Sequence, residues 1–295
     1  MDKSAILKEV FGHDSFRHGQ EEIIDNILAG KDVLGIMPTG AGKSICYQLP
    51  ALMMNGLTIV ISPLISLMKD QVSALASAGV SAACINSSLS AEEYRMTFDL
   101  IYSGMCSILY IAPERLDAPD FLSFAEKADI SMITIDEAHC VSQWGQDFRS
   151  SYLRIADFIR KLPVRPVISA FTATATSVVK EDIISLLELD SPFTITTGYD
   201  RSNLFFSVLR PDNKYKELSR MLHGYAGKSG IVYCLSRKNV EDVCSKLRQE
   251  GFPATRYHAG LSDSERKQNQ DDFIYDRCQI MVATNAFGMG IDKSN

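Results

Sequence analysis

The sequence predicts an α/β protein in which parallel strands and helices alternate in a doubly wound arrangement. Short apolar runs bounded by polar or turn residues recur along the chain, and helical patterns lie between them. The runs are too short for core helices and mostly lack strict alternation, which is typical of strands covered on both faces. Strands that alternate with helices in this way indicate a doubly wound sheet. The runs are residues 33–37, 58–61, 108–112, 132–135, 167–170, 231–234, 255–257 and 280–283.

The helical segments are identified by apolar stripes and by end signals. Residues 20–29 place apolar side chains on one stripe and stop at Gly30, the residue type that most easily adopts the left-handed cap conformation. Helices are also expected to begin after Ser90 and Ser262, because a glutamate follows each serine three residues later, which is the spacing of a capping box. Residues 214–222 are a further expected helix.

The alternation of strands and helices is interrupted at residues 198–203, and we place the domain junction there. The prediction is therefore two domains, 1–203 and 204–295, in a chain long enough for each to bury its own core. The second domain opens with the apolar run 204–209.

The bulk composition is that of an ordinary soluble globular protein, with 46% hydrophobic and 22% charged residues. Thirty basic residues against 36 acidic ones give a net charge of −6, so a nucleic-acid partner would have to be held in a local groove and not on a basic surface. No apolar run approaches the length of a bilayer span and the first residues form no signal core, so we expect a cytoplasmic location and no membrane partner. The seven scattered cysteines favour reduced thiols over disulfides or a zinc site.

A phosphate-binding turn is predicted directly after the first apolar run, at residues 37–44 (Met-Pro-Thr-Gly-Ala-Gly-Lys-Ser). Glycines allow a tight turn whose amide N–H groups point at phosphate oxygens, and the following helix adds the positive end of its dipole. Lys43 would reach the β- and γ-phosphates of ATP, and the Ser44 hydroxyl would hold Mg²⁺. The strict pattern has glycine where Met37 stands, and the alternative is a glycine-rich turn with an incidental Lys-Ser pair. The predicted binding residues are Thr39, Gly40, Ala41, Gly42, Lys43 and Ser44.

An acidic pair, Asp136 and Glu137, follows the apolar run 132–135 within the sequence Asp-Glu-Ala-His. Ligands of open α/β sheets collect at the carboxyl ends of strands, which places this pair beside Lys43. Asp136 suits a Mg²⁺ ion held through water, and Glu137 suits a base that orients or deprotonates the attacking water. An acidic pair after a strand is otherwise usually a solvated turn, so the functional interpretation depends on the neighbouring phosphate-binding turn.

With these motifs and their flanks, the sequence resembles the superfamily 2 helicases and, among them, the RecQ family. Residues 11–20 resemble that family's adenine-recognition motif, and residues 140–149 resemble its aromatic-rich loop, with Gln146 where the family usually has histidine. Trp144 is the only tryptophan of the chain, and aromatic faces stack on unpaired bases. The alternative for Trp144 and Phe148 is packing in the core. By the resemblance, ATP would also be held by His13, Arg17, Gln20 and Asp292.

Further segments follow the same family in order. Residues 61–71 and 112–116 resemble motifs that hold the DNA backbone, residues 169–175 resemble the motif that links hydrolysis to motion, and residues 198–204 resemble the hinge. For Ser236 a helix N-cap is an equally good interpretation, and His258 could be only a polar residue at a strand end. The implied DNA-binding residues are Ser62, Pro63, Gln71, Arg115, Trp144, Phe148, Arg149, Ser236 and Thr284.

The resemblance implies two RecA-like domains, the second incomplete at its C-terminus, in a cytoplasmic, nucleoid-associated protein of bacterial type. It implies a motor that uses ATP and Mg²⁺ to move 3′ to 5′ on single-stranded DNA and to open duplex junctions. The family continues with an arginine-bearing helix and zinc-binding and winged-helix domains, so we expect these 295 residues to lack zinc and to hydrolyse ATP slowly. The alternatives are a non-catalytic ATP- and DNA-binding fragment, half of a split helicase, and an RNA helicase, which the aromatic-rich loop disfavours.

Overall fold

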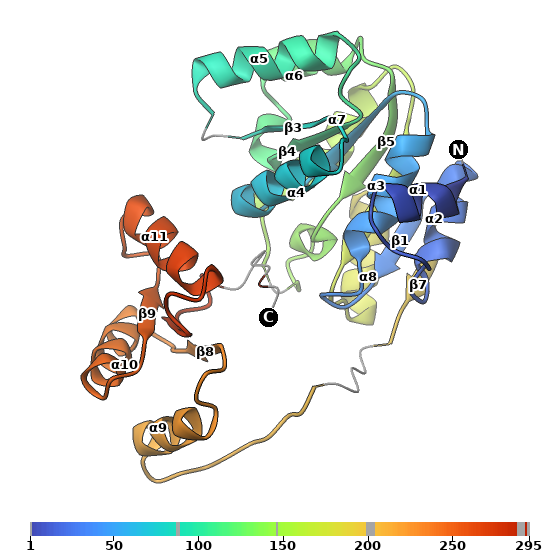
Figure 1. Ribbon diagram of the computed structural model, residues 1–295. Coiled ribbons are helices and arrows are strands. Elements are labelled where there is room, and N and C mark those ends of the chain that lie inside the picture. The colour runs from blue at the N-terminus through green and yellow to red at the C-terminus, as the bar shows by residue number, and fades with distance from the viewer. Residues whose placement is uncertain (1, 87–88, 146, 199–203, 288–292, 294–295) are drawn as a thin grey trace. The chain divides into compact units, whose positions relative to one another are not determined.

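The computed structural model describes residues 2–86, 89–145, 147–198, 204–287 and 293. The chain divides into two compact units, Met1–Arg201 and Ser202–Asn295 (Figure 1). The predicted boundary after residue 203 stays a prediction, because residues 199–203 lie outside the described part of the chain. Among the described residues, none of the helices combines the length and the apolar character that crossing a bilayer requires.

The first unit contains one parallel sheet, which has seven strands within the residues that the structure describes. In chain order the strands are β1 (Val33–Ile36), β2 (Leu57–Ile61), β3 (Ala82–Ile85), β4 (Ile108–Ile111), β5 (Ile130–Ile135), β6 (Val167–Thr172) and β7 (Phe193–Thr196). In space their order is β3-β4-β2-β5-β6-β1-β7. The chain starts at β1 next to one edge, crosses to β2 and to β3 at the other edge, and returns through β4, β5 and β6, which fill the positions between, before β7 adds the last edge strand. The five apolar runs predicted in this unit are confirmed as strands. The two edge strands, β3 and β7, were not among the predicted runs: β3 consists of mostly small apolar residues and buries only two of its four, and β7 alternates apolar residues with threonine and buries none fully.

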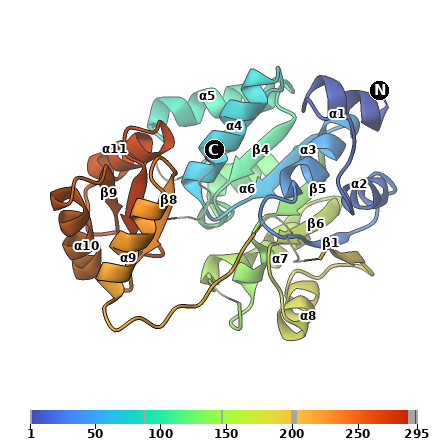
Figure 2. The same cartoon turned by 60° about the horizontal axis from the view of Figure 1, so that its bottom comes forward.

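Helices cover both faces of this sheet (Figures 1 and 2). One face packs against α2 (Gln20–Leu28), α3 (Lys43–Met53) and α4 (Ile65–Ser77), and the N-terminal helix α1 (Lys3–Glu9) packs on α2 and α3. The other face packs against α5 (Ala91–Tyr102), α6 (Pro119–Ala125), α7 (Ile155–Lys161) and α8 (Ser177–Leu186). Short 3₁₀ helices η1 (Pro113–Arg115), η2 (Ala138–Val141) and η3 (Ser150–Arg154) follow some of the strands. The doubly wound α/β fold that the sequence predicts is therefore confirmed.

The local signals at the helix ends are also confirmed. Helix α2 occupies residues 20–28, and Gly30 after it has a left-handed φ of 78°. Ser90 forms a capping box at the start of α5: its hydroxyl accepts a hydrogen bond from Glu93 N at 3.2 Å, and its own amide donates to the Glu93 carboxylate at 2.8 Å. Ser262 forms the same arrangement before α11 (Asp263–Ile274) in the second unit. These caps satisfy amide groups that the first helical turn leaves unpaired.

The second unit is a smaller parallel sheet, with helices α9 (Lys214–Gly224), α10 (Arg237–Gln249) and α11. Its described strands are β8 (Gly230–Tyr233), β9 (Ala254–Tyr257) and β10 (Ile280–Ala283), in the spatial order β8-β10-β9. All three strands and α9 agree with the predicted segments. The apolar run 204–209 forms no strand, and it leaves Phe205 91% and Val208 86% exposed. His258, at the end of β9, is buried and lies 2.8 Å from a Glu241 carboxylate oxygen.

One buried carboxylate ties together three segments at the amino-terminal side of the first sheet. Asp32 precedes β1 and is 3% exposed. It accepts hydrogen bonds from the guanidinium of Arg165 at 2.5 and 3.1 Å, from Ile168 N at 2.9 Å and from Asp190 N at 2.7 Å. Asp32 therefore holds the starts of β1 and β6 and the turn before β7 in register.

We predict that Asp32→Asn destabilises the first unit by about 2–3 kcal/mol, because it leaves the Arg165 charge and at least one buried amide without their acceptor. Thermal and urea unfolding followed by circular dichroism measure this. Asp157→Asn is the matched control, since Asp157 also pairs with an arginine, at 2.6 Å from Arg160, but is 57% exposed and should change stability by less than about 0.5 kcal/mol. Equal losses of stability in the two variants would contradict the role of Asp32 in joining these three segments.

Candidate functional site

The predicted site residues of the first unit gather at the carboxyl edge of its sheet. Strands β1 and β5 both pair with β6, and all three run in parallel. The turn after β1 and the acidic pair after β5 therefore emerge at the same edge, separated by the width of one strand. Met37 N donates to Thr172 O at 2.9 Å, which joins the turn directly to the end of β6.

The turn between β1 and α3 has the backbone conformation that its glycines allow. Gly40 and Gly42 have φ angles of 83° and 82°, in the left-handed region that favours glycine. Lys43 is the first residue of α3, and its Nζ donates to Met37 O at 3.2 Å. The ammonium group thus lies over the turn, whose backbone amides precede a helix N-terminus, where anions bind favourably.

Two residues of the predicted adenine motif hold this turn from outside. The buried Gln20 side chain donates to Ala41 O at 3.2 Å and to Gly42 O at 3.0 Å, and the Arg17 guanidinium donates to Gly40 O. A Cβ atom on Gly42 would lie 2.4 Å from the Gln20 amide nitrogen, so only glycine fits there. His13 is exposed, and Asp292, the predicted ribose contact, lies outside the described residues.

The acidic pair is held rigidly at the end of β5. Asp136 is 7% exposed; its carboxylate accepts hydrogen bonds from Glu137 N at 3.0 Å and from the Ser62 hydroxyl at 3.5 Å. The Tyr152 hydroxyl donates to the Asp136 carbonyl at 2.9 Å. Glu137 has a left-handed φ of 49°, which is uncommon for a residue with a side chain. Tyr152 is a site residue that the sequence did not reveal, because an isolated tyrosine 16 positions away from Asp136 carries no local signal.

The two carboxylates and the lysine interact electrostatically. Burial and, second to it, the neighbouring Glu137 raise the pKa of Asp136 to about 6, and Lys43 opposes this shift. Burial also raises the pKa of Glu137, and Lys43 again opposes the shift. Lys43 thus acts electrostatically on both carboxylates, which emerge at the same sheet edge as its turn. A hydroxyl, a buried carboxylate and an ammonium group at one edge are suited to a triphosphate and a hard cation.

His139 links the acidic pair to the end of β6. Its Nδ1 lies 2.8 Å from Thr172 Oγ1 and 3.3 Å from a Glu137 carboxylate oxygen. Burial lowers the pKa of His139, which favours the neutral ring at pH 7. Thr172 Oγ1 in turn donates to Thr174 O at 3.1 Å, so the Asp-Glu-Ala-His segment and residues 169–175 form one hydrogen-bonded unit.

The aromatic-rich segment after η2 exposes its tryptophan. Trp144 is 78% exposed and Phe148 39%, so the core interpretation is wrong for Trp144. The backbone beneath is fixed: Trp144 N donates to the Ser142 hydroxyl at 3.1 Å, and that hydroxyl donates to Asp182 on α8 at 2.6 Å. A Cβ atom on Gly145 would lie 2.2 Å from His139 O. The indole is thus presented to solvent on a tightly packed turn; Gln146 lies outside the described residues.

Arg149 joins this segment to the residues after β2. Its guanidinium donates to the Asp147 carboxylate at 3.0 and 2.9 Å and to Pro63 O at 2.9 Å. Ser62, next to Pro63, is 1% exposed and directs its hydroxyl at Asp136. We therefore reassign the Ser62 side chain from DNA contact to the acidic pair, because a strand-end hydroxyl buried this deeply is not available to a strand on the surface.

The remaining predicted DNA contacts are spread over both units. Arg115 on η1 is half-buried, and its guanidinium lies 5.0 Å from the ring centre of Tyr94. Gln71 on α4 is half-buried, and its side-chain oxygen accepts a hydrogen bond from Gln48 at 2.8 Å. Ser236 is exposed and caps α10, since its hydroxyl accepts a bond from Asn239 N at 3.2 Å. Thr284 follows β10, where its amide donates to Tyr257 O at 3.1 Å.

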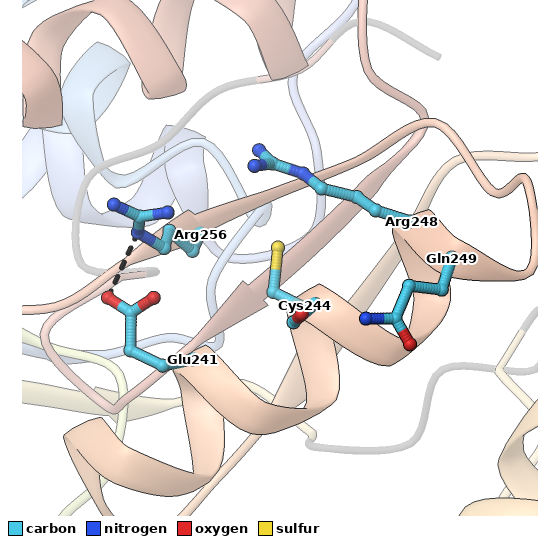
Figure 3. A pocket seen from close by; sticks show the side chains of 6 residues that line it. Glu241, Cys244, Arg248, Gln249 and Arg256 are labelled. Carbon is cyan, nitrogen blue, oxygen red and sulfur yellow. Dashed lines mark ion pairs between the residues drawn. The ribbon is translucent and has the colours of Figure 1, made fainter.

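A cavity of about 420 Å³ lies in the second unit between α10 and β9 (Figure 3). Its two arginines are engaged within the protein: Arg256 Nε lies 2.9 Å from Glu241, and Arg248 Nε donates to Ala254 O at 2.7 Å. None of the predicted site residues lines the cavity, so it is separate from the site described above. The lining residues are Glu241, Cys244, Ser245, Arg248, Gln249 and Arg256.

The same segments match known protein families. A family model described as DEAD/DEAH box helicase matches residues 17–182, more than half of the chain. The chain belongs to the DEAD/DEAH box helicases. A second model, the helicase conserved C-terminal domain, matches residues 213–295.

Two curated relatives are DNA helicases named RecQ. The chain is 47% identical over 292 residues to the ATP-dependent DNA helicase RecQ of Bacillus subtilis (strain 168), covering 99% of this chain and 49% of the relative. It is 46% identical over 290 residues to the ATP-dependent DNA helicase RecQ of Pasteurella multocida (strain Pm70), covering 98% of this chain and 46% of the relative. The chain spans about half the length of the curated relatives it matches.

Solved structures share the fold. The DUF1998 helicase MrfA bound to DNA has a TM-score of 0.75 at 18% identity, covering 99% of this chain and 43% of that one. The DEAD-box helicase Mss116 bound to single-stranded RNA and UDP-BeF has a TM-score of 0.75 at 16% identity, covering 100% of this chain and 66% of that one. At these identities the likeness is one of fold alone, and it agrees with the predicted pair of RecA-like domains.

The raised pKa of Asp136 gives a prediction about stability. A folded-state pKa near 6, above the ordinary value of 3.8, means that protonation favours folding and that this contribution is lost as the pH rises through about 6. Asp136→Asn should therefore stabilise the nucleotide-free protein by about 2–3 kcal/mol at pH 8 and by much less at pH 4. Thermal unfolding in EDTA at both pH values measures the difference, with the exposed Asp157→Asn as control. An increase in stability that is equal at the two pH values would contradict the burial of a charged Asp136.

Proposed function

We propose that this chain is the motor core of an ATP-dependent DNA helicase that moves 3′ to 5′ on single-stranded DNA, with domains 1–203 and 204–295. The observation that carries the proposal is that the turn with Lys43 and the acidic pair Asp136 and Glu137 emerge at the same edge of the sheet, on either side of β6. The RecQ-type sequence supports DNA as the substrate.

In this proposal the turn at residues 39–44 binds the phosphates of ATP. Its amides and Lys43 provide positive potential, and Gln20 and Arg17 keep the turn in shape from the adenine side. Ser44 and Asp136 would hold Mg²⁺, which supplies charge neutralisation at the phosphates. The donor set fits such an ion, because Asp136 is a carboxylate buried at a cost that a nearby cation offsets.

Glu137 is the proposed base that orients the attacking water. Its carboxylate lies beside Lys43 and 3.3 Å from His139 Nδ1, which restricts its rotation. A carboxylate next to a phosphate-binding lysine is in the right place to accept a proton from water at the γ-phosphate. His139 and Thr172 then connect any movement of Glu137 to residues 169–175.

The proposed DNA contacts rely on stacking more than on net charge. The exposed Trp144 offers a face to unpaired bases, and Phe148 is the second aromatic of the same segment. Pro63, Gln71, Arg115 and Arg149 would contact the backbone from the first unit, and Ser236 and Thr284 from the second. Phosphate contacts of this kind position a strand without a basic protein surface, which agrees with a net charge of −6.

Two substitutions separate binding from hydrolysis. Lys43→Ala should abolish binding of a fluorescent ATP analogue, because the β- and γ-phosphates lose their cation. Glu137→Gln should leave that binding within about twofold of the original protein and slow hydrolysis by about 10²-fold or more. Glu126→Gln, at an exposed position on the same unit, is the matched control. Unchanged ATP turnover in both test variants would make the site assignment wrong.

Trp144→Ala tests the stacking contact. Loss of one base stack of about 1–3 kcal/mol should weaken binding of a single-stranded DNA oligonucleotide by about 5- to 150-fold and reduce its effect on hydrolysis, with basal hydrolysis unchanged. Tyr225→Ala removes a 63% exposed aromatic in the second unit and should have no such effect. Fluorescence anisotropy with DNA and RNA of the same sequence measures both variants. A preference for RNA, or equal losses in the two variants, would count against the proposal.

A further inference from the structure

The turn that carries Trp144 is held from outside by a side chain of α8. Ser142 is fully buried, and its hydroxyl donates to the Asp182 carboxylate at 2.6 Å. Asp182 lies 40 positions further along the chain, in the middle of α8. The same Ser142 hydroxyl accepts a hydrogen bond from Trp144 N at 3.1 Å. A single serine hydroxyl therefore links Asp182 to the backbone of the exposed tryptophan.

Residues 142–145 form a β-turn. Gly145 N donates to Ser142 O at 3.0 Å, and the Ser142 hydroxyl accepts from Trp144 N, two residues further on. Serine is favoured at the first position of such a turn because its hydroxyl can bond the backbone in this way. The orientation of this one hydroxyl thus decides whether the Trp144 amide keeps its acceptor.

Asp182 fixes the orientation of that hydroxyl. A serine hydroxyl has a single proton, and it rotates to suit its partners. Because the proton is directed at the Asp182 carboxylate, a lone pair of the oxygen is left for Trp144 N. Hydroxyl bonds to a carboxylate are shorter and stronger than those between neutral groups, and 2.6 Å agrees with such a bond. Without this carboxylate the hydroxyl of Ser142 is free to turn away from Trp144 N.

Helix α8 is a rigid support for the carboxylate. Ile183, next to Asp182, is fully buried, and Val179, one turn earlier, is 3% exposed. Both belong to the same core cluster as Cys140 of η2, which precedes the turn. The helix and the start of the aromatic-rich segment are thus packed on one core. The position of Asp182 relative to Ser142 is therefore set by close packing, which allows little movement.

A second contact holds the far end of the aromatic-rich segment. The Arg149 guanidinium donates to the Asp147 carboxylate and to Pro63 O, the latter at 2.9 Å. Arg149 lies five residues after Trp144, beyond the turn, so this contact fixes where the segment ends and not how the indole is presented. Of the two contacts, the one with Asp182 is the one whose loss reaches the Trp144 amide through a single hydroxyl.

We propose that Asp182 is a positioning residue for strand binding, which holds the turn at residues 142–145 so that the Trp144 indole is presented to an unpaired base. The inference rests on the proposed function, in which Trp144 makes the stacking contact. A turn that is already held in its binding conformation loses less conformational freedom on binding, and affinity rises accordingly. Asp182 itself touches no nucleic acid; it acts through Ser142 and Trp144.

Asp182→Ala should raise the dissociation constant of a labelled single-stranded DNA oligonucleotide by about 3- to 10-fold, because the turn is no longer held before binding. Asp182→Asn keeps an acceptor oxygen for Ser142 and should stay within about twofold of the original protein. In a Trp144→Ala background, Asp182→Ala should change the affinity by less than about twofold, since it acts through the indole. Glu181→Ala removes the exposed neighbouring carboxylate on α8 and is the matched control, expected to bind DNA like the original protein. Fluorescence anisotropy of the oligonucleotide measures the constants.

The fluorescence of Trp144 tests the inference without DNA, because Trp144 is the only tryptophan of the chain. Time-resolved anisotropy separates local motion of the indole, on the picosecond to nanosecond scale, from tumbling of the protein. The amplitude of the local motion should rise by about 1.5-fold or more in Asp182→Ala and stay unchanged in Asp182→Asn and Glu181→Ala. Ser142→Ala removes the same hydrogen bond from its other end, and it replaces Asp182→Ala if circular dichroism finds that variant unfolded.

The inference is overturned if Asp182→Ala binds DNA as the original protein does, if Glu181→Ala loses as much affinity, or if Asp182→Ala costs as much in the Trp144→Ala background. Indole motion that does not respond to Asp182→Ala overturns it as well. Failure of the proposed function looks different. The original protein would then not bind DNA, or Trp144→Ala would leave its affinity unchanged, while the indole motion would still respond to Asp182→Ala.

Discussion

The rest of the site depends on the electrostatic interaction of Lys43 with the carboxylates of Asp136 and Glu137. Burying Asp136 and Glu137 is unfavourable in a low-dielectric environment, and both carboxylates have raised pKa values as a result of burial. The lysine offsets part of that cost only because β1 and β5 run in parallel on either side of β6 and end at the same edge. A cation bound at this edge, as proposed, would offset more of that cost.

Contacts between neighbouring strand ends extend from this pair across the sheet edge. Asp136 receives the Ser62 hydroxyl from the end of β2, and His139 bonds Thr172 at the end of β6. The segment after η2 is anchored by Ser142 to α8 and by Arg149 to Pro63. The acidic pair and the segments after β2, β6 and η2 are thus joined by hydrogen bonds. In the proposed motor, these bonds would pass a displacement of the acidic pair to the Trp144 turn.

The sequence predicted the features that depend on the order of neighbouring residues. Central strands are apolar throughout because both faces are covered, and the residues directly after them, such as Lys43 and Asp136, could be placed at one edge. The edge strands β3 and β7 bury fewer side chains and gave no such signal. Tyr152 and Asp182 could not be found, since their partners lie far away along the chain and a core tyrosine or a helix carboxylate looks like any other in the sequence. The inward direction of Ser62 was likewise decided by tertiary packing, not by its motif.

If this acidic chain binds DNA as proposed, it has to limit its use of charge. Arg149 is engaged by Asp147 and Pro63 O, and Arg115 stacks on Tyr94, so neither guanidinium is a free point charge at the surface. The indole of Trp144, in contrast, is openly presented: it is 78% exposed on a turn fixed by Gly145 and Ser142. Stacking requires an accessible base face, which a duplex hides and a single strand offers. The proposed surface therefore selects unpaired DNA by what it can stack on, and directed donors such as the Gln71 amide add position without adding charge.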